Sequence, residues 1–223
     1  MSGTTLGISE IFHSIQGEGS FAGWPCAFIR LAGCGHGCVG CDTSYAEDKG
    51  EEFEIEEVIQ SVLTYQVPIF EITGGEPLLQ PAVYPLMTQL CDLHKKVLLE
   101  TGGFISVEKV DQRVHKIIDI KPPSSGVAQY NNPDNIRLAL EAELPHRHTF
   151  EFKIVIADND DYQWATSLLQ QHQLTDSFTI MMGVAFGKLD PAELAEWMLR
   201  DRLQARLQLQ LHKYLWDPSR RGV

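Results

Sequence analysis

Short apolar runs rich in β-branched residues alternate with segments of helical periodicity along almost the whole chain. This alternation is typical of parallel strands joined by crossover helices, so it predicts an α/β fold. We expect seven strands, at Cys26–Ala32, Val67–Thr73, Lys96–Thr101, Lys116–Lys121, Thr149–Ala157, Phe178–Met182 and Leu207–Tyr214.

The length of the chain limits how far such a sheet can close. A complete eight-stranded barrel of alternating strands and helices usually takes about 250 residues. With 223 residues, this chain is expected to form one domain over residues 1–223. We predict a shortened, open partial (β/α) barrel with about six to seven mainly parallel strands, whose carboxyl ends carry the loops of a site.

Apolar positions spaced by three and four residues predict the helices between the strands. Ile55–Leu63 carries such a stripe, and a second stripe follows Pro85. Asp190 and Glu193 suit an N-cap and a capping carboxylate that open a third helix. Weaker patterns cover 105–114 and 135–144, and the acidic run 47–52 is interpreted as a turn followed by the first turn of a helix.

Charge and composition argue against two classes of partner. Eighteen basic and thirty acidic side chains leave a net charge of −12, which repels polyanions, so we expect no nucleic-acid partner. The N-terminus lacks a basic stretch followed by an apolar run, and no segment has the roughly 20 apolar residues that span a bilayer. We therefore expect a cytoplasmic protein that does not contact a membrane.

Three of the five cysteines, Cys34, Cys38 and Cys41, lie within eight residues of a glycine-rich loop that follows a strand. Such clustering is a poor disulfide framework and favours a metal loop. A 4Fe-4S cluster normally takes one protein ligand per iron, so three thiolates leave one iron open. We predict that these cysteines hold such a cluster and that the open iron is chelated by S-adenosylmethionine (SAM).

A zinc site is the alternative for this loop, with His36, Cys26 or Cys91 as a fourth ligand. Structural zinc loops usually contain two Cys-x-x-Cys pairs, and the sequence has one. Cys26 opens a predicted strand and Cys91 lies in a predicted helix, so we expect both to be buried, inert thiols.

The cysteine spacing resembles that of the radical SAM superfamily, and a second motif supports the resemblance. The strand 69–73 runs into Gly74-Gly75-Glu76-Pro77, where paired glycines let a backbone approach a ligand closely. In that superfamily this motif contacts the methionine end of SAM. The resemblance also assigns the later strand ends to the ribose and carboxylate of SAM, through Thr101, Asp119, Ile120 and Lys121.

Further motifs, in order along the chain from about residue 8, resemble the 7-carboxy-7-deazaguanine synthase (QueE) family. They are Gln16-Gly17-Glu18-Gly19, Phe28-Ile29-Arg30-Leu31, Cys41-Asp42-Thr43, Thr73–Pro77 and His212-Lys213-Tyr214-Leu215. The resemblance implies a magnesium-assisted conversion of 6-carboxy-5,6,7,8-tetrahydropterin to 7-carboxy-7-deazaguanine with loss of ammonia, in queuosine biosynthesis. A 5′-deoxyadenosyl radical takes hydrogen from C6 of the pterin, and SAM is regenerated. The family also implies a homodimer and an electron donor such as flavodoxin or ferredoxin.

The same resemblance gives the other candidate site residues. Arg30 would bind the pterin carboxylate, and Thr43 would be the protein ligand of Mg²⁺. His212, placed on the polar side of the strand 207–214, would contact the substrate. The remaining candidate substrate contacts are Ile15, Gln16, Gly17, Glu18, Thr73 and the tail residue Val223.

Each of these residues also has an ordinary structural interpretation, as a surface charge, a glycine-rich turn, a loop cap or a core histidine. Two positions depart from the pattern seen in many family members: Asp119-Ile120-Lys121 stands where Ser-Pro-Lys is common, and Met181-Met182-Gly183 lacks a proline. Two other functions stay open, an activating enzyme that installs a glycyl radical on a partner protein and a zinc-stabilised binding module.

Overall fold

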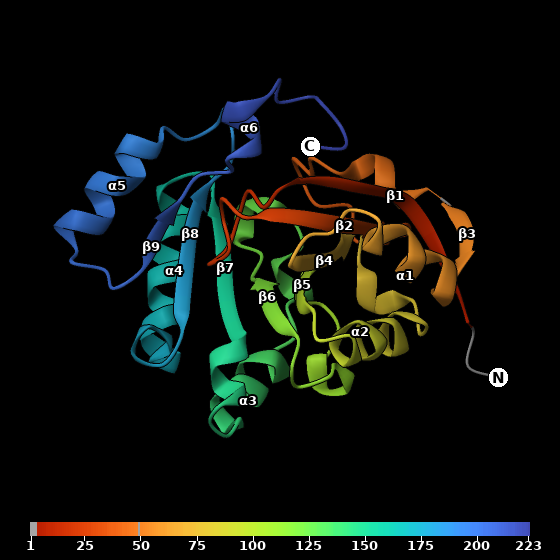
Figure 1. Cartoon of the computed structure of the whole chain (residues 1–223). Coiled ribbons are helices and arrows are strands. Elements are labelled where there is room, and N and C mark those ends of the chain that lie inside the picture. The colour runs from red at the N-terminus through yellow and green to blue at the C-terminus, as the bar shows by residue number, and fades with distance from the viewer. Residues whose placement is uncertain (1–3, 49) are drawn as a thin grey trace.

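A nine-stranded sheet forms the centre of the computed structural model, which describes residues 4–48 and 50–223 (Figure 1). Its order is β3-β1-β2-β4-β5-β6-β7-β8-β9. The strands are β1 Thr5–Ile15, β2 Pro25–Leu31, β3 Glu51–Glu54, β4 Ile69–Gly74, β5 Lys96–Thr101, β6 His115–Asp119, β7 Phe150–Ile156, β8 Thr179–Val184 and β9 Arg206–Gln208.

The seven strands from β2 to β9 pair in parallel, which confirms the predicted α/β fold with a mainly parallel, open sheet. Two further strands, β1 and β3, join antiparallel at one edge and have no counterpart in the sequence prediction. β1 escaped detection because its apolar residues are interrupted by Gly7, Ser9 and His13. Antiparallel edge strands can present one face to solvent, so their sequences are less uniformly apolar.

Two local predictions were wrong. The last strand ends at Gln208, and His212 opens the short helix α6 (His212–Leu215) instead of lying on a strand. The chain turns there because the Leu211 amide donates to the Gly17 carbonyl, outside any strand ladder. The end of the acidic run, Glu51-Glu52, opens β3, which pairs with β1, where we expected a first helical turn. Residue 49 of the run lies outside the described residues.

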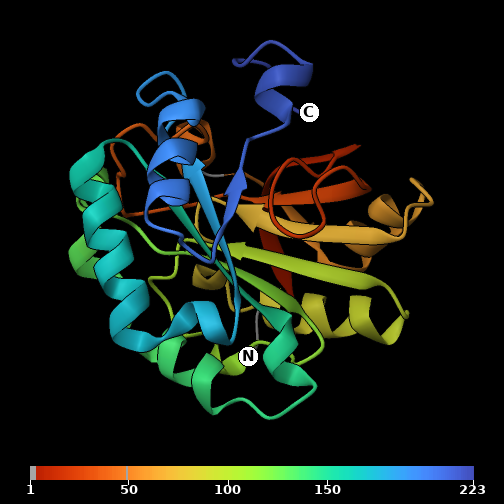
Figure 2. The same cartoon turned by 90° about the vertical axis from the view of Figure 1, so that its left-hand side faces the viewer.

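Four of the α-helices in the described chain were predicted, namely α1 Ile55–Leu63, α2 Val83–Asp92, α3 Asp134–Glu141 and α5 Pro191–Arg200. Helix α4, Asn159–His172, was not predicted, and neither was α6. Figures 1 and 2 show α1 to α4 on the outer side of the curved sheet. The pattern at 105–114 gives only the short 3-10 turn Val107–Lys109. None of the helices in the described part of the chain is long and apolar enough to cross a bilayer.

The core lies between the sheet and these outer helices. Val58 and Leu86 are fully buried there against strand residues such as Ile72. Side chains alternate along a strand, so the neighbours of the core residues point to the opposite face. On β4, Glu71 is next to Ile72 and is also buried. The inner face of the sheet therefore carries charged side chains that need partners of their own.

One side chain fastens the antiparallel edge to the parallel sheet. The Gln80 side chain accepts from the Gly7 amide at 2.8 Å and donates to the carbonyls of Gly7 and Ala32 at 2.9 and 2.8 Å. We predict that Gln80→Ala lowers the free energy of unfolding by about 2 kcal/mol, because it leaves partly buried backbone groups unpaired. Urea unfolding of the apoprotein measures this loss. Gln60→Ala, at an exposed position of α1, is the control and should change stability by less than about 0.5 kcal/mol.

Candidate functional site

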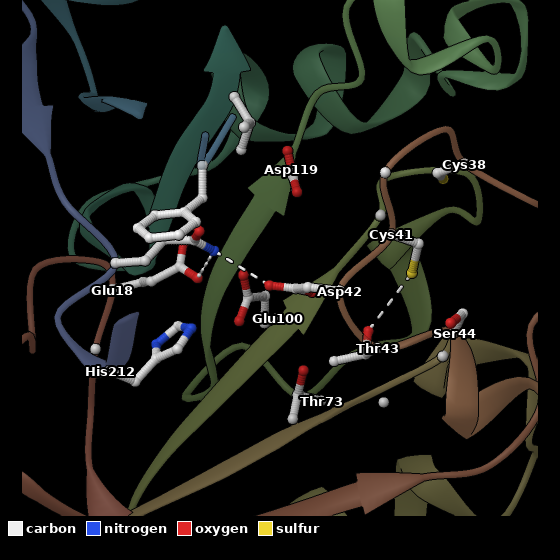
Figure 3. A pocket seen from close by; sticks show the side chains of 18 of the residues that line it. Glu18, Cys38, Cys41, Asp42, Thr43, Ser44, Thr73, Glu100, Asp119 and His212 are labelled. Carbon is white, nitrogen blue, oxygen red and sulfur yellow. Dashed lines mark hydrogen bonds between the residues drawn. The ribbon is translucent and has the colours of Figure 1, made fainter. Parts of the chain in front are cut away.

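A cavity of about 740 Å³ opens at the carboxyl ends of the parallel strands. Its wall combines the β1–β2 loop, the cysteine loop, the strand ends and the segment after β9 (Figure 3). It brings together most of the residues predicted from the sequence: Ile15, Gln16, Gly17, Glu18, Arg30, Cys34, Cys38, Cys41, Thr43, Thr73, Gly74, Gly75, Thr101, Asp119, Lys121, His212 and Val223.

Two predicted residues do not reach the cavity wall. The Glu76 carboxylate is fully buried and accepts hydrogen bonds from the Thr101 hydroxyl and from the amides of Leu78 and Gly102. It therefore ties β4 to β5 behind the cavity. Ile120 is 6% exposed and belongs to the apolar core, with its amide bonded to the Lys153 carbonyl.

The cysteine loop is held against β4 by backbone hydrogen bonds. The Gly75 amide donates to the Leu31 carbonyl at 3.1 Å, and the Glu76 amide donates to the Gly33 carbonyl at 2.9 Å. A Cβ atom at Gly75 would lie 2.4 Å from the Gly33 oxygen and 2.7 Å from the Cys34 Cβ. Only glycine permits this approach, so the two glycine-containing motifs form one unit of structure.

The three loop thiols suit a cluster better than a single zinc ion. Cys34, Cys38 and Cys41 all line the cavity, whereas Cys26 and Cys91 are buried in apolar clusters, as predicted. Zinc takes four donors around one point, whereas three thiolates of a 4Fe-4S cluster each bind a separate iron. In residues 4–48 and 50–223 no group of three or more His, Cys, Asp or Glu side chains is already arranged to hold a single metal ion.

The ammonium group of Lys153, on β7, is the centre of a buried charge cluster. Its Nζ lies 2.5 Å from Glu18 Oε2, 2.5 Å from Glu100 Oε1 and 3.8 Å from Asp119 Oδ2. Burial would lower the pKa of Lys153, but the carboxylates of Glu100, Glu18 and Asp119 raise that pKa well above its usual range. Lys153 is therefore a permanent cation at the base of the cavity.

The carboxylates around this cation have different protonation preferences. Burial raises the pKa of Glu18 in spite of Lys153. Burial would also raise the pKa of Glu100, but Lys153 brings it below the usual value. Burial and the neighbouring Glu100 raise the pKa of Glu71 well above its usual range, and Glu71 also accepts a hydrogen bond from the Gln16 amide. Glu71 thus favours its protonated form while Glu100 stays ionised.

The strand ends on the cluster side offer groups that fit SAM. Asp119 Oδ2 pairs with Lys121 at 2.7 Å, while its Oδ1 is buried and accepts no hydrogen bond from any residue that the structure describes. Such an orphaned acceptor suits a donor on a ligand, for example a ribose hydroxyl. The Thr101 hydroxyl is already bonded to Glu76, so it lines the cavity without a free proton to offer.

The opposite side of the cavity is built from the β1–β2 loop, β2 and the segment after β9. The Arg30 Nε donates to Glu10 Oε1 at 2.8 Å, and within the described chain no second carboxylate pairs with its guanidinium. His212 packs on Gly17, where a Cβ atom would lie 2.6 Å from His212 Nδ1. Burial lowers the pKa of His212, which favours a neutral imidazole. Figure 3 shows Glu18 and His212 on the same side of the cavity.

Sequence reasoning missed two charged residues of the inner face, Glu71 and Lys153. Each stands inside a strand whose other members are mostly apolar, as in Phe150-Glu151-Phe152-Lys153-Ile154. A charged residue in a strand that is buried on both faces needs a partner or a ligand. That signal was present in the sequence and points to the inner face of the sheet.

Comparisons with known proteins agree on a family. Residues 28–125 match the family model of the radical SAM superfamily. A 7-carboxy-7-deazaguanine synthase from Chlorobaculum tepidum is 59% identical over 218 residues, covering 98% of this chain and 97% of that protein. Another, from Koribacter versatilis, is 38% identical and covers 97% of this chain and 99% of its own. The fold is similar to the crystal structure of QueE from Escherichia coli, with a TM-score of 0.69, 21% identity and coverage of 92% and 95% of the two chains.

The close approach at Gly75 predicts the effect of adding one methyl group. Gly75→Ala should push the cysteine loop away from β4, because the new Cβ would overlap Gly33 and Cys34. We expect the reconstituted variant to hold less than about half of the wild-type iron, measured by iron and sulfide analysis. Gly7→Ala is the control, since its Cβ would meet other atoms only at 3.5 Å or beyond. Full iron loading of Gly75→Ala would contradict the prediction.

Proposed function

Because this chain belongs to the 7-carboxy-7-deazaguanine synthase family of radical SAM enzymes, we propose that its cavity converts 6-carboxy-5,6,7,8-tetrahydropterin to 7-carboxy-7-deazaguanine with loss of ammonia. The observation that carries the proposal is that the cysteine loop, Arg30 and Glu18 line one cavity. The family is one of lyases that use a 4Fe-4S cluster and SAM. Membership sets aside the glycyl-radical activating enzyme and the zinc module.

The cluster side of the cavity would be served by Cys34, Cys38 and Cys41. When bound there, the reduced cluster and SAM supply a 5′-deoxyadenosyl radical that can take hydrogen from C6 of the pterin. The protein's part is to hold the cofactor in place. Gly74 and Gly75 line the cavity next to the cysteine loop and would lie against the methionine end of SAM. The unpaired Oδ1 of Asp119 can accept from the ribose.

On the substrate side, Arg30 is suited to the carboxylate of the pterin. A guanidinium has five N–H donors in a planar fork that matches a carboxylate. Glu10 uses the Nε of Arg30 and so fixes the direction of the fork. Ionic anchoring of the carboxylate would place C6, the carbon that carries it, at a defined position relative to the cysteine loop.

The other end of the pterin is an aminopyrimidone edge rich in donors, and the base of the cavity is rich in acceptors. Glu18 is fixed there by Lys153 and by the Gln210 amide at 2.9 Å. Ile15, Gln16, Gly17, Thr73 and His212 line the same cavity and would complete the substrate pocket. Val223 would close the pocket over the pterin.

Mg²⁺ belongs to the proposal through Thr43. The Thr43 hydroxyl lies beside the cluster loop, 3.7 Å from the Cys41 sulfur, and lines the cavity on the same side as Ser44 and Asp42 (Figure 3). Mg²⁺ prefers oxygen ligands and keeps several waters, so one hydroxyl and the substrate carboxylate suffice to place it. The ion would bridge the substrate to the protein near the cluster.

The proposed function also includes the domain organisation, location, oligomeric state and electron donor of the protein. We propose that residues 1–223 act as one radical SAM domain in the cytoplasm, as a homodimer. An electron donor such as flavodoxin or ferredoxin would reduce the cluster. These features follow from membership of the family, and oligomeric state is testable by light scattering of the purified protein.

Anaerobic reconstitution tests the activity directly. The protein with cluster, SAM, Mg²⁺, dithionite and 6-carboxytetrahydropterin should form 7-carboxy-7-deazaguanine, detected by mass spectrometry. Arg30→Ala should lose at least about 99% of this product, because the carboxylate loses its anchor, while slow SAM cleavage without substrate continues. Arg113→Ala, at an exposed salt bridge far from the cavity, is the control. An intact cluster that cleaves SAM but forms no product in the wild type would refute the proposed reaction.

The role of Thr43 predicts a change in metal dependence. Thr43→Ala should raise the Mg²⁺ concentration needed for half-maximal turnover by about tenfold, because one oxygen ligand is lost. Thr43→Ser keeps the hydroxyl and should stay close to wild type. Initial rates over a range of Mg²⁺ concentrations measure the effect. Equal Mg²⁺ dependence in the alanine and serine variants would remove Thr43 from the metal site.

A further inference from the structure

Lys153 lines the cavity and pairs with Glu18, but the resemblance to known families gives it no role of its own. Its side chain is 6% exposed. Its ammonium group contacts Glu18 on the proposed pterin side and Asp119 on the proposed SAM side. It also contacts Glu100. The ammonium thus joins the two halves of the cavity into one charged cluster.

We propose that Lys153 is a positioning residue, which holds the Glu18 and Glu100 carboxylates ionised and correctly directed so that the cavity can bind a ligand rich in N–H donors. This inference rests on the proposed function, because it assumes that Glu18 faces the pterin. It assigns to β7 a part in substrate recognition that none of the family's motifs in this chain includes.

Strand register explains why one lysine can serve several carboxylates. β6 and β7 pair so that Asp119 is opposite Lys153, and Glu100 stands on the next strand, β5. Parallel strands lie about 4.8 Å apart, so side chains on one face of neighbouring strands reach one another. Glu18 comes to the same point from the β1–β2 loop. The lysine is therefore the one contact common to three separate segments.

Comparison with a second buried lysine separates this role from simple packing. Lys116 lies on β6 and is 2% exposed, yet its Nζ is bonded to the Val114 carbonyl at 2.8 Å and to the Thr149 hydroxyl at 2.9 Å. It neutralises no carboxylate of the cavity and does not line it. Lys116 is therefore a matched control for the loss of a buried ammonium group from the same sheet.

The charge cluster also predicts how the pH dependence of ligand binding should change when Lys153 is removed. Burial raises the pKa of Glu18, and Lys153 acts against that rise. Loss of Lys153 removes the opposing effect, so Glu18 should hold its proton up to a higher pH. The other charged or titratable groups around Lys153 are Glu71, Glu100, Asp119, Lys121, Asp42 and His212. Removing the Lys153 cation favours protonation of the carboxylates in this group. Their pKa values therefore shift upward, as the pKa of Glu18 does.

The experiment measures binding of 6-carboxypterin to cluster-reconstituted protein with SAM and Mg²⁺, by calorimetry between pH 6 and pH 9. We expect Lys153→Met to bind at least about tenfold more weakly than wild type at pH 7.5. Its loss of binding on acidification should begin at a higher pH than in the wild type, because Glu18 without Lys153 takes up its proton at a higher pH. Lys153→Arg keeps the charge and should restore the wild-type pH profile. Lys116→Met should match wild type within about threefold.

The variants and the wild-type protein separate the possible failures. Iron content and thermal unfolding identify misfolding, and Lys153→Gln, which is polar and of similar length, replaces the methionine variant if that one does not fold. A weakened variant whose pH profile is unmoved would overturn the inference, because a purely structural role predicts that result. Wild-type binding with no effect of Lys153→Met or Lys153→Gln would overturn it too, while leaving the proposed function intact. A wild type that neither binds nor converts the pterin would overturn both.

Discussion

The contact between the cysteine loop and the end of β4 is the constraint from which the rest of the site follows. The missing side chain at Gly75 lets its backbone approach Gly33 and Cys34, where a Cβ atom would lie 2.4 Å from the Gly33 oxygen. The cysteine loop is thereby fixed to a strand at the centre of the sheet. Side chains at the ends of the neighbouring strands are thereby held in fixed positions relative to the cysteine loop.

The inner face of the sheet shows how a protein can keep charge in its interior. Buried carboxylates are costly unless each is paired or protonated. Here Glu100 is kept ionised by Lys153, whereas Glu71 favours its proton. The two neighbouring carboxyl groups therefore differ in the protonation state that each favours.

The parallel strands and their helices could be predicted from the sequence because their apolar runs follow the period of the element. β5 was predicted with its observed bounds. The motif residues were also predicted to meet, since parallel strands end at one edge. The edge strands β1 and β3 were missed because their stability comes from pairing with each other and with β2, not from an apolar pattern. His212 was misplaced for a related reason: its backbone follows a tertiary hydrogen bond to Gly17 that no local pattern reveals.

Lys153 was overlooked because its role depends on contacts with segments that are far apart in the sequence. A single charged residue in a buried strand indicates only that some group of opposite charge must neutralise it. Which partner does so depends on register, and register follows from the folded sheet.

Two hydrogen bonds join the start of the chain to its end. The Leu211 amide donates to the Gly17 carbonyl, and the Gln210 side chain donates to Glu18, which is 192 residues away in the sequence. During synthesis Gly17 and Glu18 emerge from the ribosome long before these partners. The cysteine loop and most of the sheet can therefore form while one wall of the cavity is still missing. A nascent chain of this kind would form the cysteine loop early and would complete the wall of the cavity only at the end of translation.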